Sequence, residues 1–453
     1  MNSDLIQKYN IPGPRYTSYP TVPFWDKKGI AMEDWKNSVV KAFKESNQTE
    51  GISIYIHLPF CESLCTFCAC HKKITKQHGV EAPYIATLLK EWQLYCELFD
   101  EKPRIKEIHL GGGTPTFFSI ENLTELIEGI LSKAEVCDDF EFSYEGHPNH
   151  TSEAQLEGLF NLGFKRNSFG IQDYDPVVQK AINRIQSFEQ VKEVHELSKK
   201  IGYKSISHDL VFGLPFQHEH SIRNTIEKTV ALKPDRIAYY SYAHVPWIKG
   251  VGQRGFDEND LPQDKEKRYL YELGKQLFFD NGYVEIGMDH FALPTDSLYK
   301  AMENKKLHRN FMGYTAGKTA LMVGLGMSSI SDSWYAFAQN EKSVSAYTER
   351  VEEGKLPIFR GHLLTEEDLV IRKSILDLMC HLETKWHPAL SEKTKDGIKS
   401  RLQSLVEDEL LVLTDRGVSV KEEGRMFVRN ICMAFDLRLI ENKPETRIFS
   451  MTI

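Results

Sequence analysis

Four cysteines lie within ten residues of one another in the segment CESLCTFCAC, at positions Cys61, Cys65, Cys68 and Cys70. Thiolates at this density are typical of zinc sites and of iron-sulfur clusters. A structural zinc site usually joins two separated pairs of ligands, and no second pair lies nearby. This spacing therefore favours a zinc site less than an iron-sulfur cluster. Three cysteines spaced three and two residues apart can instead ligate three irons of a 4Fe-4S cluster, whose fourth iron then stays open.

An open iron can be chelated by the amino and carboxylate groups of S-adenosylmethionine, and homolysis of that cofactor gives a 5′-deoxyadenosyl radical. Two further features fit this chemistry. The triplet Gly111-Gly112-Gly113 lets backbone amides approach a ligand closely, with the methionyl group as the candidate. The aromatic Phe67 suits packing against adenine, although it serves equally well as the core of its own loop.

The elements that must position these residues follow a repeated strand and helix pattern. Six β-branched or aromatic runs alternate with amphipathic stretches from about residue 52, which predicts a parallel sheet in an α/β fold; they span residues 52–58, 105–110, 140–145, 166–172, 205–213 and 236–245. Each run ends in polar or glycine-rich residues. Because catalytic loops of strand-helix barrels follow the carboxyl ends of the strands, we expect the active site there, although Gly and Pro also mark ordinary turns.

The flanking segments differ from this central repeat. Residues 1–48 include the proline-spaced, aromatic IPGPRYTSYPTVPFW, which predicts an extended arm over the barrel mouth. Residues 49–345 form the predicted partial (β/α)6 barrel and its extension. Residues 346–453 are mainly helical and end in a helix, two short strands around Asp415-Arg416-Gly417 and another helix, which resembles a winged-helix module.

Composition excludes several classes of protein. The chain has 453 residues and a formal net charge of −8, which would repel nucleic acid. The N-terminus lacks a signal-peptide pattern, and the most apolar window, near residues 320–327, is too short to cross a membrane. We therefore expect a cytoplasmic protein without membrane or nucleic-acid partners, and a monomer by default. In a reducing compartment eight cysteines predict metal or redox chemistry rather than a disulfide framework.

The cysteine spacing followed by GGGTP is similar to the radical S-adenosylmethionine superfamily. Within it, the whole chain resembles the family of oxygen-independent coproporphyrinogen III oxidases. The segments that carry this resemblance spread from residue 12 to residue 436; they are PGPRYTSYPT, YIHLPFCESLCTFCAC, LGGGTPT, FGIQDY, DLVFGLP, YAHVP, GMDHFA, HRNF-GYT and RNICMAFD.

The resemblance implies that two propionates of coproporphyrinogen III become vinyl groups, which gives protoporphyrinogen IX and two CO2. It also implies two molecules of S-adenosylmethionine beside a 4Fe-4S cluster. By the matching positions, the resemblance assigns the cluster to Cys61, Cys65 and Cys68 and catalytic roles to Tyr55 and Glu145. It assigns the first cofactor molecule to Tyr55, Gly112, Glu145 and Ile330. The residues assigned to the second cofactor molecule are Phe67, Gly113, Thr114, Gln172, Arg184, Asp209 and Ala243. Residue types agree, since Arg184 can pair with a carboxylate and the two acids can accept hydrogen bonds.

The substrate carries four propionates, so we expect cationic groups at the barrel mouth; Arg15, His290 and Arg309 are our hypotheses. An electron donor and an electron acceptor remain unidentified. The chain departs from the family pattern at two places. Where the family has EVDP, this chain has Glu145-Gly146-His147-Pro148. Where the family has HRNFQGYTT, this chain has HRNFMGYTA, which contains Met312 and Ala316. The role of Cys70 and the effects of His147 and Met312 stay open.

Three alternatives share parts of this pattern. A haem chaperone paralogue keeps the three cluster cysteines but normally lacks the fourth cysteine and the N-terminal arm, and both are present here. A radical methyltransferase or a haem-degrading relative would share the barrel and the cluster. A zinc scaffold is the remaining alternative, and it would carry zinc without acid-labile sulfide.

Overall fold

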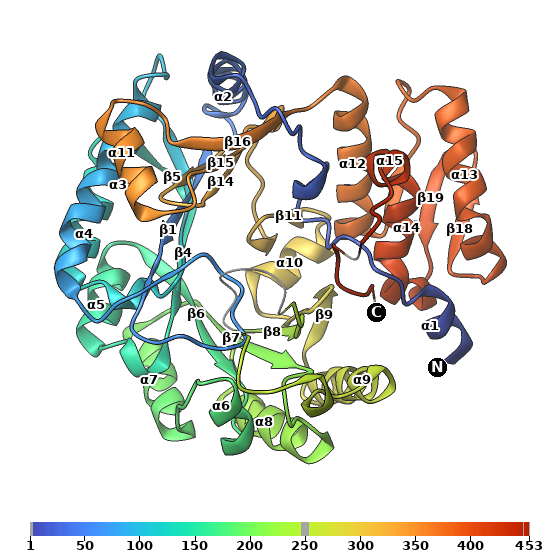
Figure 1. Cartoon of the computed structure of the whole chain (residues 1–453), viewed down its shortest axis with the longest axis horizontal. Helices are drawn as coiled ribbons and strands as arrows, with labels where there is room; N and C mark the ends of the chain where they lie inside the picture. The colour runs from blue at the N-terminus through green and yellow to red at the C-terminus, as the bar shows by residue number, and fades with distance from the viewer. Residues whose placement is uncertain (1–2, 246–252, 447, 453) are drawn as a thin grey trace.

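The computed structural model describes residues 3–245, 253–446 and 448–452. Most of the chain folds around one large curved sheet, and a smaller group of helices from the C-terminal part of the chain packs beside it (Figure 1). Pro246, the last residue of the YAHVP motif, lies outside the described residues. None of the described helices is long and apolar enough to cross a membrane.

Six parallel strands form the centre of the sheet, and each of them pairs with the next in chain order. They are β1 (Ile52–Leu58), β4 (Arg104–Gly112), β5 (Glu135–Gly146), β6 (Phe164–Gln172), β7 (Ser205–Phe212) and β8 (Arg236–Ser241). All six runs predicted from the sequence are strands. The predicted α/β class with a partial (β/α)6 barrel is therefore confirmed.

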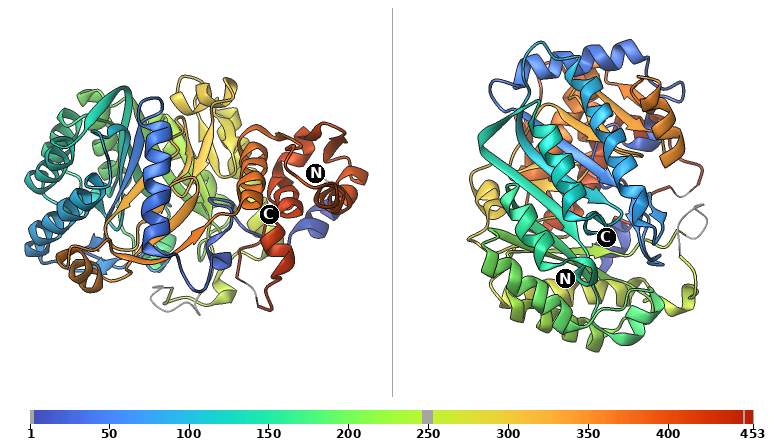
Figure 2. Two further views of the ribbon diagram at one scale, coloured as in Figure 1. Left: turned by 90° about the horizontal axis from the view of Figure 1, so that it is seen from above. Right: turned by 90° about the vertical axis from the view of Figure 1, so that its left-hand side faces the viewer.

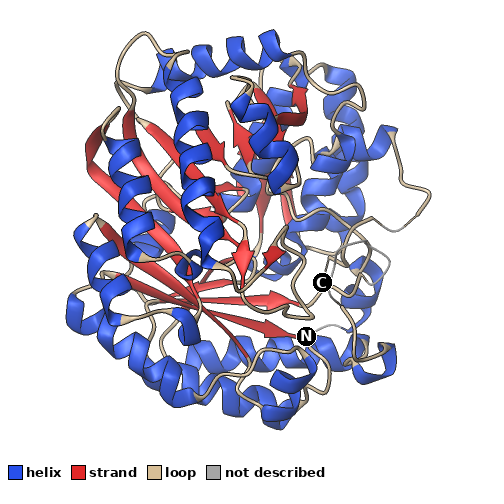
Figure 3. Cartoon of the chain, turned by 60° about the vertical axis from the view of Figure 1, so that its left-hand side comes forward, coloured by secondary structure: helices blue, strands red, loops and turns tan. Residues whose placement is uncertain are grey.

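Helices cover the outer face of this sheet (Figure 3); they are α3 (Glu81–Cys96), α4 (Ile120–Leu131), α5 (Glu153–Asn161), α6 (Pro176–Ala181), α7 (Phe188–Ile201), α8 (Glu219–Leu232) and α9 (Asp264–Asp280). Alternate strand residues such as Ile54, Ile56 and Ile108 point outward and are completely buried beneath them. Ser119 caps the amino-terminal end of α4, because its hydroxyl accepts a hydrogen bond of 3.2 Å from the Asn122 amide.

Shorter strands extend the sheet at both edges, so the barrel stays open. The edge beside β1 continues with β13 (Met322–Leu325), which is parallel to β1. Three antiparallel strands follow: β14 (Ile330–Asp332), β15 (Ala336–Asn340) and β16 (Ile358–Leu363). The edge beside β8 continues with β10 (His290–Ala292) and β9 (Val284–Gly287). The sheet thus runs past residue 345, where we predict a domain boundary; the division into domains stays a prediction.

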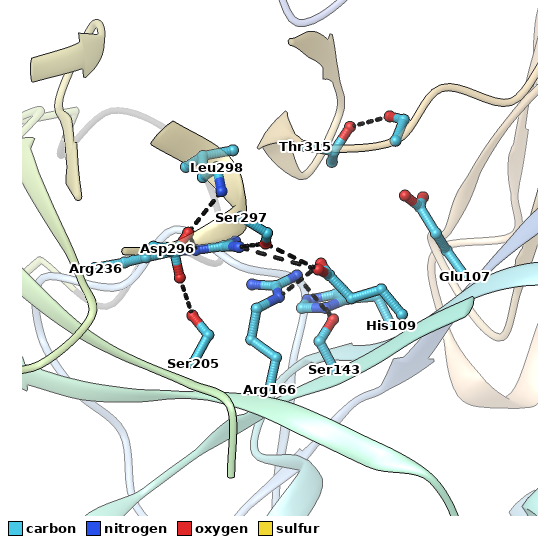
Figure 4. Close-up of polar contacts among 12 residues, drawn as sticks. Glu107, His109, Ser143, Arg166, Ser205, Arg236, Asp296, Ser297, Leu298 and Thr315 are labelled. Atoms are coloured by element: carbon cyan, nitrogen blue, oxygen red, sulfur yellow. Dashed lines mark hydrogen bonds and ion pairs between the residues drawn. The ribbon is translucent and has the colours of Figure 1, made fainter. Parts of the chain in front are cut away.

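Ionic contacts close the amino-terminal end of the barrel (Figure 4). The Arg236 Nε donates to Asp296 Oδ1 at 2.7 Å, and the Ser205 hydroxyl donates to Asp296 Oδ2 at 2.7 Å. Arg166 pairs with Glu141 at 2.9 Å in the same layer. Asp296 also caps α10 (Ser297–Glu303). Charges at this end are therefore neutralised by protein groups, whereas the carboxyl ends of the strands carry the cavity described below.

The N-terminal segment connects the two parts of the fold. The helix α2 (Met32–Ser46) buries Trp35, Val39 and Phe43 in the main core. The shorter α1 (Ser3–Tyr9) lies beside the C-terminal helices, and both chain ends lie in that region (Figure 2). Between the two helices the arm is bound by Arg429, whose Nε donates to the Pro14 carbonyl at 2.9 Å.

The C-terminal group is built as the sequence predicts, from helices around a small sheet in the order β17-β19-β18. Its elements are α12 (Glu366–His381), β17 (Glu383–Lys385), α13 (Glu392–Glu407), β18 (Leu411–Thr414), β19 (Gly417–Val420), α14 (Val428–Phe435) and α15 (Leu437–Glu441). The helix, two strands and helix expected of a winged-helix-like module are all present. The remaining short elements are α11 (Val344–Glu352), β2 (Phe60–Cys61), β3 (Lys73–Ile74), β11 (His308–Asn310) and β12 (Gly313–Thr315).

Candidate active site at the carboxyl ends of the strands

One cavity lies where the sequence predicts the site, at the carboxyl ends of the parallel strands. Its lining comes from the loop after β1 and from the ends of β4, β5, β6 and β7; the predicted residues in it are Cys61, Cys65, Phe67, Cys68, Gly112, Gly113, Thr114, Glu145, Gln172, Arg184 and Asp209. Cys70 and His147 line it too. Segments up to about 150 residues apart in the sequence thus border one space.

The cysteine loop begins at β2, where Cys61 is buried, and continues through the half-buried Cys65 and Cys68. Polar neighbours contact the sulfurs. The Thr114 hydroxyl donates to Cys61 Sγ at 3.3 Å, and an Arg184 guanidinium N–H points to Cys65 Sγ at 3.8 Å. These contacts orient the sulfurs along the cavity wall, as donors to thiolates do.

The cysteine thiols differ in acidity. Burial raises the pKa of Cys61 to about 11. A hydrogen bond from the Cys70 thiol lowers the pKa of Cys68 to about 6, and that bond holds the pKa of Cys70 well above its ordinary value. Cys70 therefore supports the thiolate of Cys68 in this structure.

The donor set fits a cluster better than a single ion. Among the described residues, no three His, Cys, Asp or Glu side chains are grouped closely enough to hold one metal ion. A 4Fe-4S cluster binds each thiolate to a different iron, so its ligands do not have to converge on one point. The cavity beside the three sulfurs and the glycine triplet next to it provide the space that such a group requires.

The glycine triplet packs against the end of β1 with no room for side chains. A β-carbon at Gly113 would lie 2.6 Å from the Pro59 carbonyl, and one at Gly112 would lie 2.7 Å from the His57 ring. Gly112 also has φ +112°, a conformation that L side chains rarely adopt. Backbone hydrogen bonds from Gly113 to Leu58, at 2.9 Å, and from Thr114 to Phe60, at 3.0 Å, fix this contact.

Glu145 presents a carboxylate to the cavity, with 46% of its side chain exposed. Its Oε2 accepts a hydrogen bond of 3.3 Å from the Gly112 amide, and its Oε1 lies 3.5 Å from His109 Nε2. Burial acts to raise its pKa, but the hydrogen bond and charge of His109 outweigh burial and hold the pKa below its ordinary value. Glu145 is therefore an ionised acceptor at the cavity wall.

Tyr55 lies on β1, two strands away from Glu145, and stacks on His109 of the intervening β4, with ring centroids 6.0 Å apart. Its hydroxyl lies 3.2 Å from His57 Nδ1, and the other ring nitrogen of His57 lies 2.8 Å from the His71 carbonyl. Burial lowers the pKa of His57 to about 4, so this imidazole is neutral near pH 7. The sequence-based assignment missed His57 and His109, although two-residue alternation from Tyr55 and Gly111 places both on the inner face.

Most of the groups expected around a second ligand line the same cavity. Arg184 donates to the Gly170 carbonyl at 2.6 Å, while its buried Nε has no hydrogen-bond partner within the described part of the chain. Gln172 holds the left-handed backbone conformation, with φ 67°, at the end of β6. Such strain is often found at functional sites. Phe67 packs against the hydrophobic cluster around Val178.

Asp209 lies within β7, three residues before its end, and lines the same cavity. Burial, followed by the nearby charge of Glu145, raises its pKa to about 7. Asp209 can therefore hold a proton near neutral pH, whereas Glu145 does not. Glu145 and Asp209 thus differ in charge.

Three of the predicted cofactor residues are not among those that line the cavity: Tyr55, described above, and Ile330 and Ala243. Ile330 is the first residue of β14, and its carbonyl lies against Gly324 of β13. Gly324 in turn pairs with Tyr55 of β1. Ala243 follows β8, is exposed, and accepts a hydrogen bond from Gln253 at 2.8 Å. Ile330 is thus two strands from β1, and Ala243 lies beyond the last parallel strand.

The three residues proposed for the substrate come together from distant segments. Arg15 on the arm forms an ion pair with Asp289, and Arg309 donates to the Arg15 carbonyl at 3.2 Å. The rings of His290 and Tyr314 are 5.4 Å apart, and the Arg309 guanidinium lies 4.5 Å from the Tyr314 ring. Two Arg309 nitrogens, Nε and Nη1, are buried and have no partner among the described residues.

The two departures from the family pattern occupy different environments. His147 is buried and lines the cavity; burial, followed by the charge of Arg184, lowers its pKa to about 2. Its Nδ1 accepts a hydrogen bond of 3.1 Å from the Asn149 amide. Met312 lies in the turn between β11 and β12 and is not among the residues that line the cavity.

The raised pKa of Asp209 predicts a pH-dependent cost to stability. A carboxyl with a higher pKa in the folded state stabilises the fold while protonated, and that contribution is lost as pH rises from about 4 to about 7. We expect cofactor-free Asp209→Asn to exceed the wild type in free energy of unfolding by on the order of 2 kcal/mol at pH 8, with a smaller gain at pH 5.

Urea denaturation at pH 5, 6, 7 and 8 measures this difference. The exposed Asp138→Asn is the matched control, and it should not show a gain that grows with pH. A gain of Asp209→Asn that is equal at all four pH values would contradict the assignment.

Comparisons with known proteins agree with this geometry. Residues 55–229 match the Radical SAM superfamily. The oxygen-independent coproporphyrinogen III oxidase of Pseudomonas aeruginosa is 36% identical over 96% of this chain and 95% of its own, and that of Helicobacter pylori strain J99 is 38% identical over 96% of each. The solved coproporphyrinogen III oxidase of Escherichia coli, a radical SAM enzyme, superposes with a TM-score of 0.89 at 32% identity over 96% of this chain and 98% of its own. The chain therefore belongs to the oxygen-independent coproporphyrinogen III oxidases of the radical SAM superfamily.

Proposed function

We propose that this protein converts two propionate side chains of coproporphyrinogen III to vinyl groups without oxygen, which gives protoporphyrinogen IX and two CO2. One observation carries the proposal. In a chain of this family, Cys61, Cys65 and Cys68 border the same cavity as Gly112 and Glu145. The residues that we assign to the cluster and to S-adenosylmethionine thus border the same space.

We assign the cluster to these three cysteines. When bound, the 4Fe-4S cluster and S-adenosylmethionine supply the radical that removes a hydrogen atom from the propionate β-carbon, after which CO2 and one electron leave. Tyr55, Gly112, Glu145 and Ile330 are assigned to the first S-adenosylmethionine. Since Glu145 is ionised and partly exposed, it can accept hydrogen bonds from the cofactor's amino group.

We assign a second S-adenosylmethionine to the same cavity; its proposed contacts are Phe67, Gly113, Thr114, Gln172, Arg184, Asp209 and Ala243. The Nε of Arg184, which has no hydrogen-bond partner among the described residues, supports this assignment, because a buried guanidinium N–H needs an acceptor and a carboxylate supplies one. Asp209, with its pKa near 7, can donate or accept a hydrogen bond there.

The substrate is assigned to the cationic group formed by Arg15, His290 and Arg309. Buried arginine nitrogens without partners suit bidentate pairing with a propionate. His290 is neutral, since burial lowers its pKa to about 4, so it contributes a hydrogen bond rather than a charge. The reaction also requires an external electron donor and an acceptor. We infer a monomer acting in the cytoplasm, where the eight free cysteines would stay reduced.

The test of this function is formation of vinyl groups from coproporphyrinogen III under anaerobic conditions. We expect wild-type protein with a reconstituted cluster to give protoporphyrinogen IX, and Cys65→Ala to lose the iron-sulfur absorbance and the activity. Cys96→Ala, which removes a thiol from α3, should retain both. Product formation by a Cys65→Ala protein that lacks iron would contradict the proposal.

The same assay separates the alternatives. A haem chaperone would bind haem and form no vinyl product, and a methyltransferase or a haem-degrading enzyme would give other products. Matches to oxidases over nearly the whole chain do not favour these alternatives.

The substrate assignment has its own test in Arg309→Ala. Loss of one charge-assisted pair to a propionate should raise the KM for coproporphyrinogen III about tenfold or more, with iron content and S-adenosylmethionine binding unchanged. Steady-state kinetics with iron and sulfide analysis measures this, and the exposed Arg416→Ala is the control. An unchanged KM in a folded Arg309→Ala protein would remove Arg309 from the site.

A further inference from the structure

We propose that a basic patch beside the cysteine loop docks an acidic one-electron carrier protein that reduces the cluster. This inference rests on the proposed function, which requires an external electron. The basic patch is defined by four cations and two apolar side chains: Lys72, Lys73, Lys342, Arg360, Ile74 and Phe359.

One half of the basic patch is bonded directly to the cysteine loop. β3 pairs in parallel with β2, so that Ile74 is aligned with Cys61 and the Thr75 amide donates to the Cys61 carbonyl at 2.9 Å. Lys72 Nζ donates to the carbonyl of Cys68 at 3.1 Å. A carrier that contacts β3 would therefore be separated from the first cluster ligand by one short strand.

The other half lies on the edge of the large sheet, around the beginning of β16. A chain of hydrogen bonds joins it to the loop: His71 Nδ1 lies 2.5 Å from the Ser328 hydroxyl, Gln339 Nε2 donates to the Ser328 carbonyl at 3.0 Å, and Arg360 Nε donates to Gln339 Oε1 at 2.8 Å. Lys342 Nζ lies 5.1 Å from the Phe359 ring. The two halves are thus linked by hydrogen bonds through the buried Ser328 and Gln339.

The charge of the basic patch is not neutralised. None of its four cations forms an ion pair with a described residue, although the chain as a whole has a net charge of −8. Local positive charge on an acidic protein attracts an acidic partner and accelerates its encounter.

The patch also offers apolar contacts. Phe359 is 51% exposed and Ile74 is 40% exposed, so two hydrophobic side chains lie among the cations. Redox encounters use small, weak interfaces, which an area of this kind suits. The substrate is also anionic, but its proposed cations, Arg15 and Arg309, belong to a separate group tied to the arm.

The electron balance of the step is simple. The carrier is oxidised by one electron and the cluster is reduced by that electron, and no bond forms or breaks. Each S-adenosylmethionine cleaved needs one such delivery.

The test uses cluster-loaded protein without substrate and a recombinant acidic flavodoxin, reduced to its hydroquinone, as the probe. We expect the double variant Lys73→Glu/Lys342→Glu to lower the second-order rate constant of flavin oxidation about tenfold or more, with a weaker dependence on salt. Reduction by dithionite, iron content and sulfide content should match the wild type. The control Lys133→Glu/Lys393→Glu makes the same change in net charge at two exposed lysines elsewhere and should leave the rate unchanged.

Equal rates for the double variant and the wild type would overturn the proposal. If the KM for coproporphyrinogen III were raised as well, the result would indicate that the basic patch attracts the substrate instead. If the double variant does not retain its cluster, the single variant Lys342→Gln, measured in the same way, decides by a lowered or unchanged rate. Failure of the proposed function appears separately, as an absence of vinyl product with dithionite as reductant.

Discussion

The close backbone contact between residues 57–61 and residues 111–114 is the constraint on which the site depends. Two amides, of Gly113 and Thr114, donate to carbonyls at the end of β1, and neither Gly112 nor Gly113 has space for a β-carbon. Because of this contact, the loop that carries the cysteines and the turn that carries the glycines border one cavity. The Thr114 hydroxyl then reaches the sulfur of Cys61.

The two ends of the barrel differ in how their charged groups are paired. At the amino-terminal end, buried arginines and acids pair with one another, as Arg236 does with Asp296 (Figure 4). At the carboxyl end, charged and polar groups are left without full pairing: Glu145 is ionised beside a cavity, Asp209 has a pKa near 7, and an Arg184 nitrogen has no described partner. Buried groups of this kind are costly, so they are expected where a ligand supplies the missing interactions.

The sequence predicts the centre of this fold well, because inward and outward positions alternate along each strand and the helices keep their own period. Runs such as ISIYIHL therefore identify β1, and the cysteine spacing identifies the metal-binding loop. Gly112 and Glu145 lie at or next to the carboxyl ends of their strands, whereas Tyr55, in the middle of β1, is assigned by the resemblance alone. His57 and His109 lie on the same inner faces, but a single histidine in a strand carries no signal of its own.

Other parts of the site depend on contacts that no local pattern records. Arg15 precedes His290 by 275 residues and Arg309 by 294 residues, and the three meet only after the arm folds back on the barrel extension. The short strands β13 to β16 are too brief to show a period, and their pairing places Ile330 near Tyr55. No local pattern assigns Ile330 or Ala243 to the site, so their assignment rests on the resemblance alone.

The most direct measurement of the central claim is the electron paramagnetic resonance spectrum of the dithionite-reduced protein with and without S-adenosylmethionine. The account predicts that adding S-adenosylmethionine changes the cluster signal of the wild type. It predicts no change in Gly113→Ala, because the added methyl group would collide with the Pro59 carbonyl and displace the glycine triplet from the cysteine loop. A Gly113→Ala protein that keeps its cluster and shows the wild-type change would contradict the account.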